Sequence, residues 1–150
     1  MVNEMNSEEY NSMGFCGLCC EDCFNHKGEI ADLARDLRKK LREANFNKAA
    51  QGLSKYFKDF KDYEQCYQVL GAMVRLRCNR TCRNGGGNPS CKARACCQKK
   101  EILGCWQCDE YETCTKLDFL KPIHGDANLK NIKTIRNKGI TAFLQGKRYF

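Results

Sequence analysis

The sequence predicts a mainly α protein, a small single domain of helices joined by irregular zinc-knuckle loops. Three observations predict this fold class. Apolar residues recur at helical spacings of three and four in the first half of the chain and again near its end. Cysteine is several times more frequent than usual, at 13 of 150 residues, and most cysteines form closely spaced pairs. A triple glycine and a proline interrupt the second half. A chain of this length buries about 70% of its unfolded surface, so we expect one domain, 1–150.

The compartment determines what so many cysteines do. The opening residues, MVNEMNSEEYNSMGF, are acidic where a signal peptide needs positive charge, and no apolar segment follows them. No run approaches the roughly 18 apolar residues of a membrane span, so we expect a cytoplasmic protein without a membrane association. Thiols stay reduced there, which favours metal binding or redox chemistry over a disulfide framework.

The first expected element is an N-terminal knuckle, residues 14–26. Four of its residues are cysteines: Cys16, Cys19, Cys20 and Cys23. A helical stretch over 29–76 follows it. The clearest helix runs from Glu29 to Ala44, where apolar residues recur at helical spacing: Ile30, Leu33, Leu37, Leu41 and Ala44.

Two further apolar stripes complete the helical stretch. The second pattern passes through Ala50, Leu53, Tyr56, Phe57 and Phe60. The third passes through Tyr63, Cys66, Tyr67, Leu70 and Met73. We expect these apolar stripes to be core, and we interpret Cys66 as a buried thiol that packs as a small hydrophobe.

The cysteine-rich segment, 78–114, is the least regular part of the chain. Eight cysteines lie in it: Cys78, Cys82, Cys91, Cys96, Cys97, Cys105, Cys108 and Cys114. Between these pairs, residues 83–89 hold three glycines and a proline, which favour turns with unusual backbone angles. The phosphate-binding pattern G-x-x-x-x-G-K-[ST] is absent. We therefore interpret this loop as a tight turn around a metal.

The C-terminal helices are expected over 126–149. Asp126 or Asn128 can cap a helix, and Gly139 is placed to end it. The apolar residues of that helix are Leu129, Ile132 and Ile135. A last short helix begins at Ile140 and includes Phe143 and Leu144.

The cysteine spacing is typical of zinc. Structural zinc takes four ligands in a tetrahedron, and a C-x2-C pair places two sulfurs on one tight turn. The pairs are Cys16 with Cys19, Cys20 with Cys23, Cys105 with Cys108, Cys78 with Cys82 and Cys91 with Cys96. Two four-cysteine sites are the simplest count, and the spacing does not say which pairs share an ion. One arrangement joins the pair Cys78 and Cys82 to the pair Cys105 and Cys108, and the N-terminal knuckle then recruits Cys91, Cys96 or Cys114. His26 and His124 are alternative ligands.

Iron and thiol redox chemistry are the alternatives. The spacing of Cys16, Cys20 and Cys23 is similar to the cluster-binding triplet of radical S-adenosylmethionine enzymes, but the alternation of strands and helices that those enzymes need is absent. The pair Cys105 and Cys108 is similar to a thioredoxin-like motif without its βαβ setting. The commoner catalytic motifs are missing, so the chain is more simply a non-enzyme.

The charge pattern raises a second alternative, nucleic-acid binding. From Arg75 to Lys100 the chain carries eight basic residues and no acidic one. The formal charge of +8 counts every thiol as neutral. Eight ligating thiolates and two zinc ions would leave about +4, so part of the basic charge can balance metal sites.

The order CGLCCEDC, then CNRTCRNGGGNPSCKARACCQKKEILGCWQCDEYETCTKL, resembles the cysteine-rich family called domain of unknown function 3795. The tail LKNIKTIRNKGITAFL is similar to the family's terminal helix. The resemblance implies zinc and no established activity. Carried over residue by residue, it implies a set of ligands and a binding role for Arg94. The ligands are Cys16, Cys20, Cys23, Cys78, Cys82, Cys91, Cys96, Cys105, Cys108 and Cys114. Cys19 stands where the family usually has aspartate, and Cys97 and Cys66 are extra, so Cys19, Cys97 and His26 are secondary candidates.

The sequence therefore predicts an uncharacterised protein with cysteine-ligated structural zinc, two ions by the simplest count, acting as a binding or interaction module with a protein partner. An iron–sulfur or thiol redox protein and a nucleic-acid-binding zinc protein are the alternatives.

Overall fold

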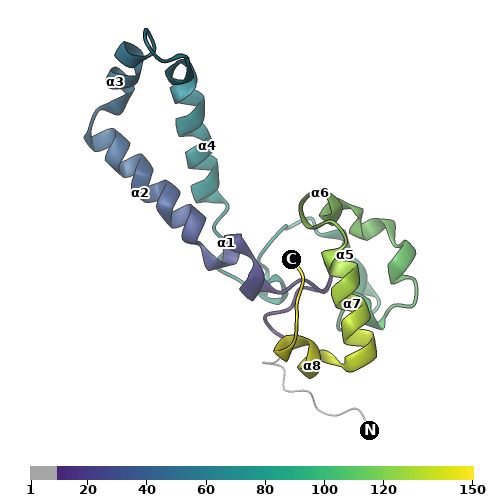
Figure 1. Cartoon of the computed structure of the whole chain (residues 1–150). Coiled ribbons are helices and arrows are strands. Elements are labelled where there is room, and N and C mark those ends of the chain that lie inside the picture. The colour runs from purple at the N-terminus through teal and green to yellow at the C-terminus, as the bar shows by residue number, and fades with distance from the viewer. Residues whose placement is uncertain (1–9) are drawn as a thin grey trace. The chain divides into compact units, whose positions relative to one another are not determined.

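A computed structural model describes residues 10–150 of the chain (Figure 1). Helices are its only regular elements, and the part of the chain that it describes contains no strand beyond an isolated bridge between Met13 and Cys19. The mainly α prediction is thus confirmed. Most of the N-terminal segment on which the expected location rests lies outside the described residues.

The chain divides into two compact units. The helical unit is Lys27–Cys78, and the cysteine-rich unit joins the described residues before it, up to His26, to Asn79–Phe150. The single domain 1–150 stays a prediction, and each unit is described by itself.

The helical unit is an antiparallel hairpin. Helix α2 (Glu29–Glu43) and helix α4 (Tyr63–Arg75) run side by side in Figure 1, and α3 (Phe46–Leu53) lies between them in sequence. The first and third predicted helices are confirmed. The second pattern breaks, because α3 ends at Leu53 and only a short 3-10 helix, Lys58–Asp62, follows. Gly52 and Ser54, both weak helix formers, stand at this break.

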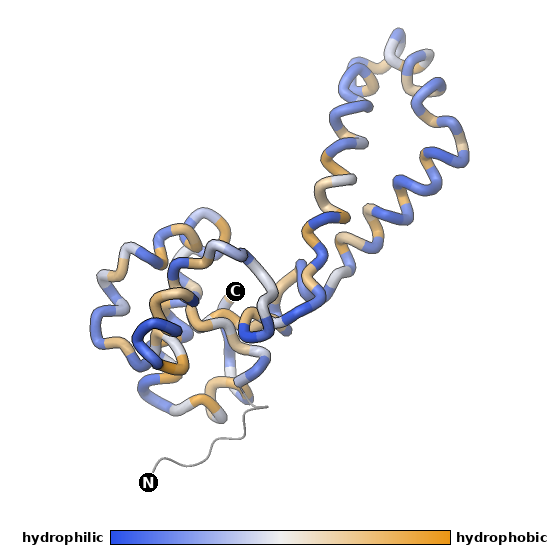
Figure 2. Tube along the Cα trace, turned by 180° about the vertical axis from the view of Figure 1, so that it is seen from behind, coloured by the Kyte–Doolittle hydropathy of each residue, from blue (hydrophilic) through white to orange (hydrophobic). Residues whose placement is uncertain are grey.

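The prediction that the α2 stripe is core is wrong. The side chains of Ile30, Leu33 and Leu37 are 47%, 71% and 48% exposed. The residues that α2 buries are instead Ala31 and Ala34. A hairpin of two helices covers only one side of each, so the rest of an apolar stripe stays in solvent. In Figure 2 the hairpin accordingly alternates hydrophilic and hydrophobic residues along its length.

The other two stripes are also only partly buried. In the second stripe Ala50 is buried, whereas Tyr56 and Phe57 are exposed. The third stripe is half-buried at Tyr63, Tyr67, Leu70 and Met73. Cys66 is exposed as well, so its interpretation as a buried thiol is wrong. It lies on the solvent side of α4, which the hairpin leaves uncovered.

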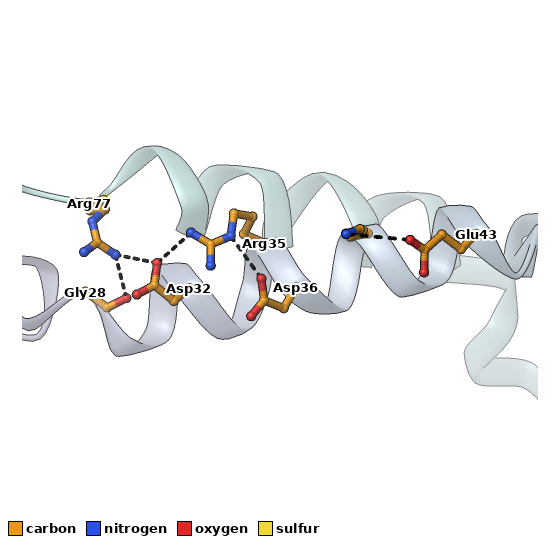
Figure 3. Close-up of polar contacts among 7 residues, drawn as sticks. Gly28, Asp32, Arg35, Asp36, Glu43 and Arg77 are labelled. Carbon is orange, nitrogen blue, oxygen red and sulfur yellow. Dashed lines mark hydrogen bonds and ion pairs between the residues drawn. The ribbon is translucent and has the colours of Figure 1, made fainter.

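A polar cluster closes the base of the hairpin (Figure 3). Arg77 donates to the Asp32 carboxylate and, at 3.4 Å, to the carbonyl oxygen of Gly28. Gly28 has a φ of 77°, and a Cβ there would meet the Arg77 guanidinium at 2.6 Å. Its backbone angle therefore favours glycine, and a side chain there would also displace the Arg77 guanidinium.

The cysteine-rich unit contains helix α5 (Lys92–Lys99), α6 (Lys121–His124), α7 (Ala127–Lys138) and α8 (Ile140–Gln145). Helix α1 (Phe24–Lys27) leads from this unit into the hairpin. The expected C-terminal helices are present: α7 begins directly after Asp126, ends at Gly139 with a φ of 83°, and is followed at once by α8. Helix α5 was not expected from the sequence.

The core of this unit joins the two ends of the chain. Its most deeply buried side chains include Met13, Ile132 and Phe143. Asn131, with no exposed surface, donates from Nδ2 to the carbonyl oxygens of Gly17 at 3.0 Å and Tyr149 at 2.8 Å. Its Oδ1 accepts from the Tyr149 amide at 2.9 Å. One side chain on α7 therefore holds the N-terminal knuckle and the C-terminal tail.

Each helix within residues 10–150 falls short of the length and apolar character that crossing a membrane requires.

Candidate metal centre

Five cysteines line one pocket of the cysteine-rich unit. Cys96 and Cys97 come from α5, Cys105 and Cys108 from a 3-10 helix (Cys105–Gln107) and its end, and Cys114 from the next turn. The pocket has a volume of about 270 Å³. The amide of Cys108 donates to the carbonyl oxygen of Cys105 at 3.1 Å, which closes that C-x2-C pair into a tight turn. Four of these five cysteines belong to the predicted ligand set.

Two lysines accompany the thiols. Lys116 Nζ lies 3.4 Å from Cys96 Sγ, and Lys100 Nζ lies 3.6 Å from Cys108 Sγ. An ammonium group beside a sulfur favours the thiolate, which is the form that binds a metal. The interaction with Cys108 correspondingly raises the pKa of Lys100. The pocket thus offers soft donors and positive charge to balance them.

Cys97 and Cys105 touch each other inside this pocket. Their sulfurs are 3.7 Å apart, and the two residues are 1% and 8% exposed. The hydrogen bond between them lowers the pKa of Cys97 and, together with burial, raises that of Cys105. A sulfur-to-sulfur hydrogen bond, in which either thiol can be the donor, thus links the pair.

A second group of cysteines gathers around Cys16. Burial, with smaller contributions from Cys82 and Cys91, raises the pKa of the Cys16 thiol to about 12. A Cβ at Gly14 would lie 3.4 Å from Cys16 Sγ and 3.9 Å from Cys82 Cβ. The grouping differs from the arrangement suggested by spacing, since Cys82 lies near Cys16 and Cys91, and Cys105 and Cys108 face Cys96 and Cys114.

Arg94 braces the loop between these cysteines. Its guanidinium donates to the carbonyl oxygens of Cys82 at 3.0 Å, Gly86 at 2.7 Å and Asn88 at 2.8 Å. Its backbone amide donates to Cys91 Sγ at 3.4 Å, at the start of α5. These bonds account for Arg94 as a structural donor, and its binding role stays a prediction.

Gly86 of this loop serves close packing, whereas Gly85 and Gly87 have positive φ angles and open space around them. A Cβ at Gly86 would lie 1.8 Å from the carbonyl oxygen of Arg80, so no other residue fits there without a shift of the backbone.

The remaining candidates lie elsewhere. Cys20 begins a 3-10 helix (Cys20–Asp22) and Cys23 directly follows it, and the Cys23 amide donates to the Cys20 carbonyl oxygen at 3.0 Å. Cys78 is the last residue of the helical unit. Cys19 is buried, and burial raises the pKa of its thiol to about 12.

The two histidines each hold a buried Nδ1 without a hydrogen-bond partner among the described residues. The His124 ring packs edge-on against Phe150, with the ring centres 4.6 Å apart. His26 lies on α1, three residues after Cys23. An orphaned ring nitrogen is compatible with a ligand, so His26 stays a secondary candidate.

The cysteine sulfurs are donors of the type that zinc prefers, although they do not point at one common position. Within residues 10–150, no group of three or more Cys, His, Asp or Glu side chains is close enough to hold a metal ion. All thirteen cysteines, which lie within these residues, are free thiols. The cysteines surround the pocket instead of meeting at a point. A cysteine sulfur swings through staggered positions about a single bond, so binding requires rotamer changes in the pocket.

Sequence reasoning missed Lys116 as a partner of this centre, and it identified Arg83 and Lys100 only as members of the basic run. Arg83 donates to the carbonyl oxygens of Met13 at 3.0 Å and Leu103 at 2.6 Å, and its guanidinium lies 4.3 Å from the centre of the Phe15 ring. For Arg83 and Lys100, the signal in the sequence was the basic run from Arg75 to Lys100. Several basic side chains of this run contact carbonyl oxygens or sulfurs of the protein itself, which weakens the interpretation of the run as a nucleic-acid surface.

Comparison with known proteins gives one match. The sequence model of the family described as Protein of unknown function (DUF3795) matches residues 12–119, more than half of the chain. This confirms the resemblance, and the C-terminal helices expected to share it lie outside the matched residues. No curated protein and no solved structure matches the chain.

Proposed function

The chain belongs to the DUF3795 family, whose description names no activity, and from its own residues we propose a zinc protein stabilised by cysteine ligation, with its helical hairpin as an interaction element. The observation that carries the proposal is the pocket lined by five cysteines and flanked by two lysine ammonium groups. Zinc bound there would act structurally, and such ions contribute about 10–16 kcal/mol to folding in small modules.

The ligands of one ion would be Cys96, Cys105, Cys108 and Cys114. Four thiolates are the usual donor set of a closed structural zinc site, and Cys105 and Cys108 supply the knuckle turn. Lys100 and Lys116 would offset the negative charge of four thiolates around a divalent ion. The segment 101–120 consists of short 3-10 helices and turns, so a metal there would add order to a segment that lacks a longer helix.

A second ion would take Cys16, Cys82 and Cys91. The shared electrostatic influence of these thiols supports the grouping. The fourth ligand would come from the N-terminal knuckle, where Cys20 and Cys23 are available. Arg94 would hold the loop that carries Cys82 and the helix end that carries Cys91.

Metal analysis of protein purified anaerobically without a metal-affinity tag tests this proposal. We expect about two zinc per chain in a colourless sample. Cys108→Ser should retain about one zinc, and Cys66→Ser, the matched control on the exposed side of α4, should retain two. Iron with acid-labile sulfide would favour the iron–sulfur alternative. Metal-free protein, or full zinc in Cys108→Ser, would overturn the site.

The exposed apolar stripe of α2 supports the interaction element. Ile30, Leu33 and Leu37 follow the spacing by which one helix packs along another. On the helical projection, acidic Asp36 and basic Lys40 border the stripe, so its rim carries both charge signs. A helix with an apolar face and mixed flanking charges is therefore the partner that we propose.

Affinity capture of binding proteins by the natural chain and by two variants tests this element. Proteins bound by the natural chain should be lost with Leu33→Glu. They should still bind Val69→Glu, because Val69 is an exposed apolar residue on α4 and not on the α2 stripe. Hydrogen exchange in a recovered complex should slow at the α2 amides. Equal capture by both variants would contradict a role for the α2 stripe.

A further inference from the structure

Of the five cysteines that line the pocket, Cys97 is the one that the proposed ligand set does not use. It lies on α5 beside Cys96, is almost fully buried, and its sulfur is 3.7 Å from that of Cys105. A disulfide has a sulfur separation of about 2.05 Å, so bonding requires the two sulfurs to approach by about 1.7 Å. Rotation of the two cysteine side chains between staggered positions changes the separation of their sulfurs by a distance of this order.

Access to this pair is through the pocket. Both residues line it, and its volume of about 270 Å³ admits a small molecule but leaves little room for a bulky one. Lys100 lines the same pocket, with its ammonium nitrogen 3.6 Å from Cys108 Sγ and 3.6 Å from the Glu110 carboxylate. Two touching thiols that line a pocket of this volume are the parts that a dithiol reactive toward a small peroxide needs.

We propose that Cys97 and Cys105 form an oxidisable dithiol whose reagent is a small hydroperoxide such as hydrogen peroxide. In the first step the Cys97 sulfur attacks the peroxide, the O–O bond breaks, and sulfenic acid and water form. In the second step the Cys105 sulfur attacks that sulfenic sulfur, the S–O bond breaks, and a disulfide and a second water form. Two thiols are oxidised by two electrons, and one peroxide is reduced to two waters.

The consequence for the metal rests on the proposed function. Cys105 is one of the four proposed ligands, and a disulfide sulfur is not a thiolate donor. Oxidation would leave three ligands and release the ion, and reduction of the disulfide would restore the site. Cys97 is thus assigned the role of a sensor that is not itself a ligand.

The experiment treats the zinc-loaded protein with hydrogen peroxide, follows zinc release with a chromogenic chelator, and maps disulfides by alkylation and mass spectrometry. The natural chain and Cys66→Ala should form the bond between Cys97 and Cys105 and release one zinc. Cys97→Ala should keep its zinc content before treatment and release it about tenfold more slowly. A bulky aromatic disulfide should react with Cys66 well before it reaches the pair.

Two results would overturn the proposal: a bond between Cys105 and Cys108 in place of the one to Cys97, or equally fast zinc release from Cys97→Ala. Cys97→Ser, with circular dichroism as a folding check, replaces the alanine variant if that variant loses its fold. Protein that purifies without zinc would contradict the proposed function alone, because disulfide mapping of that protein still tests the pair.

Discussion

The buried side chain of Asn131 connects two distant parts of this protein by hydrogen bonds. It satisfies the carbonyl oxygens of Gly17 and Tyr149 and the amide of Tyr149. The sequence could not disclose this role, because an asparagine on a helix is ordinarily read as a surface residue. Its partners lie 114 and 18 residues away, and only the folded chain brings them together.

Asn131→Ala should lower the free energy of unfolding by about 3 kcal/mol, since it leaves buried backbone groups without partners. Urea denaturation followed by tryptophan fluorescence measures the change. Asn137→Ala, an exposed position on the same helix, should change stability by less than about 0.5 kcal/mol. Equal effects in the two variants would contradict the assigned hydrogen bonds.

Arg83 is a second residue whose role the basic run concealed. Its guanidinium donates in several directions and packs over aromatic rings, a geometry that lysine cannot reproduce. Arg83→Lys keeps the charge and should still cost about 1–2 kcal/mol of stability. Arg75→Lys, on the exposed end of α4, serves as the control. An unchanged unfolding midpoint for Arg83→Lys would mean that charge alone matters at this position.

At the scale of elements, the apolar periodicity correctly predicted most of the helices but not which of their faces are buried. The helices α2, α4, α7 and α8 follow from apolar spacing and from Gly139. Spacing says that one face is apolar, but it does not say whether a neighbour covers that face. The α2 stripe shows this limit. Helix α5 was missed because cysteines and basic residues dominate it, and its apolar contacts reduce to Ala93 and Cys97.

The exposure of α2 gives a test on adjacent residues. Leu33→Glu places a charge in solvent and should change stability by less than about 0.5 kcal/mol. Ala34→Glu places a charge at a residue that is only 4% exposed and should unfold the hairpin. Far-ultraviolet circular dichroism during urea titration distinguishes the two, and a destabilised Leu33→Glu would show that its side chain is covered.

The base of the hairpin should respond to acid. The hydrogen bond and charge of Arg77 lower the pKa of Asp32, so the pair stabilises the hairpin above the ordinary carboxyl range near pH 4. This contribution is lost as the pH falls through the lowered pKa. Asp32→Asn should weaken the pH dependence of hairpin unfolding between about pH 5 and pH 2, and Asp36→Asn should change it less.

At the scale of the whole molecule, the cysteine spacing indicated a metal site but not its grouping. Spacing within a turn decides which cysteines can share an ion locally, as in Cys105 and Cys108. Which turns face one another depends on the packing of α5 and of the 3-10 helices, which leaves no periodic trace in the sequence. The lysines beside the sulfurs could not be distinguished from surface lysines for the same reason.

Metal removal should change the spectroscopic signal of the cysteine-rich unit more than that of the helical hairpin. Trp106, the only tryptophan, follows Cys105 directly and is buried in the cysteine-rich unit. A strong chelator should shift its emission to longer wavelength, while much of the helical signal, to which the hairpin contributes, persists. Unchanged emission after complete zinc removal would show that the metal does not order this unit.

The cysteine-rich unit is built from two sequence segments, and the hairpin is inserted between them. This arrangement sets an order of events during synthesis. The N-terminal knuckle leaves the ribosome long before α7, so Gly17 has no Asn131 to bind until α7 is made. The hairpin, made of neighbouring segments, can already form by then. During this interval the cysteines of the N-terminal knuckle are accessible thiols. Newly made chains should therefore be more sensitive to oxidation than finished molecules.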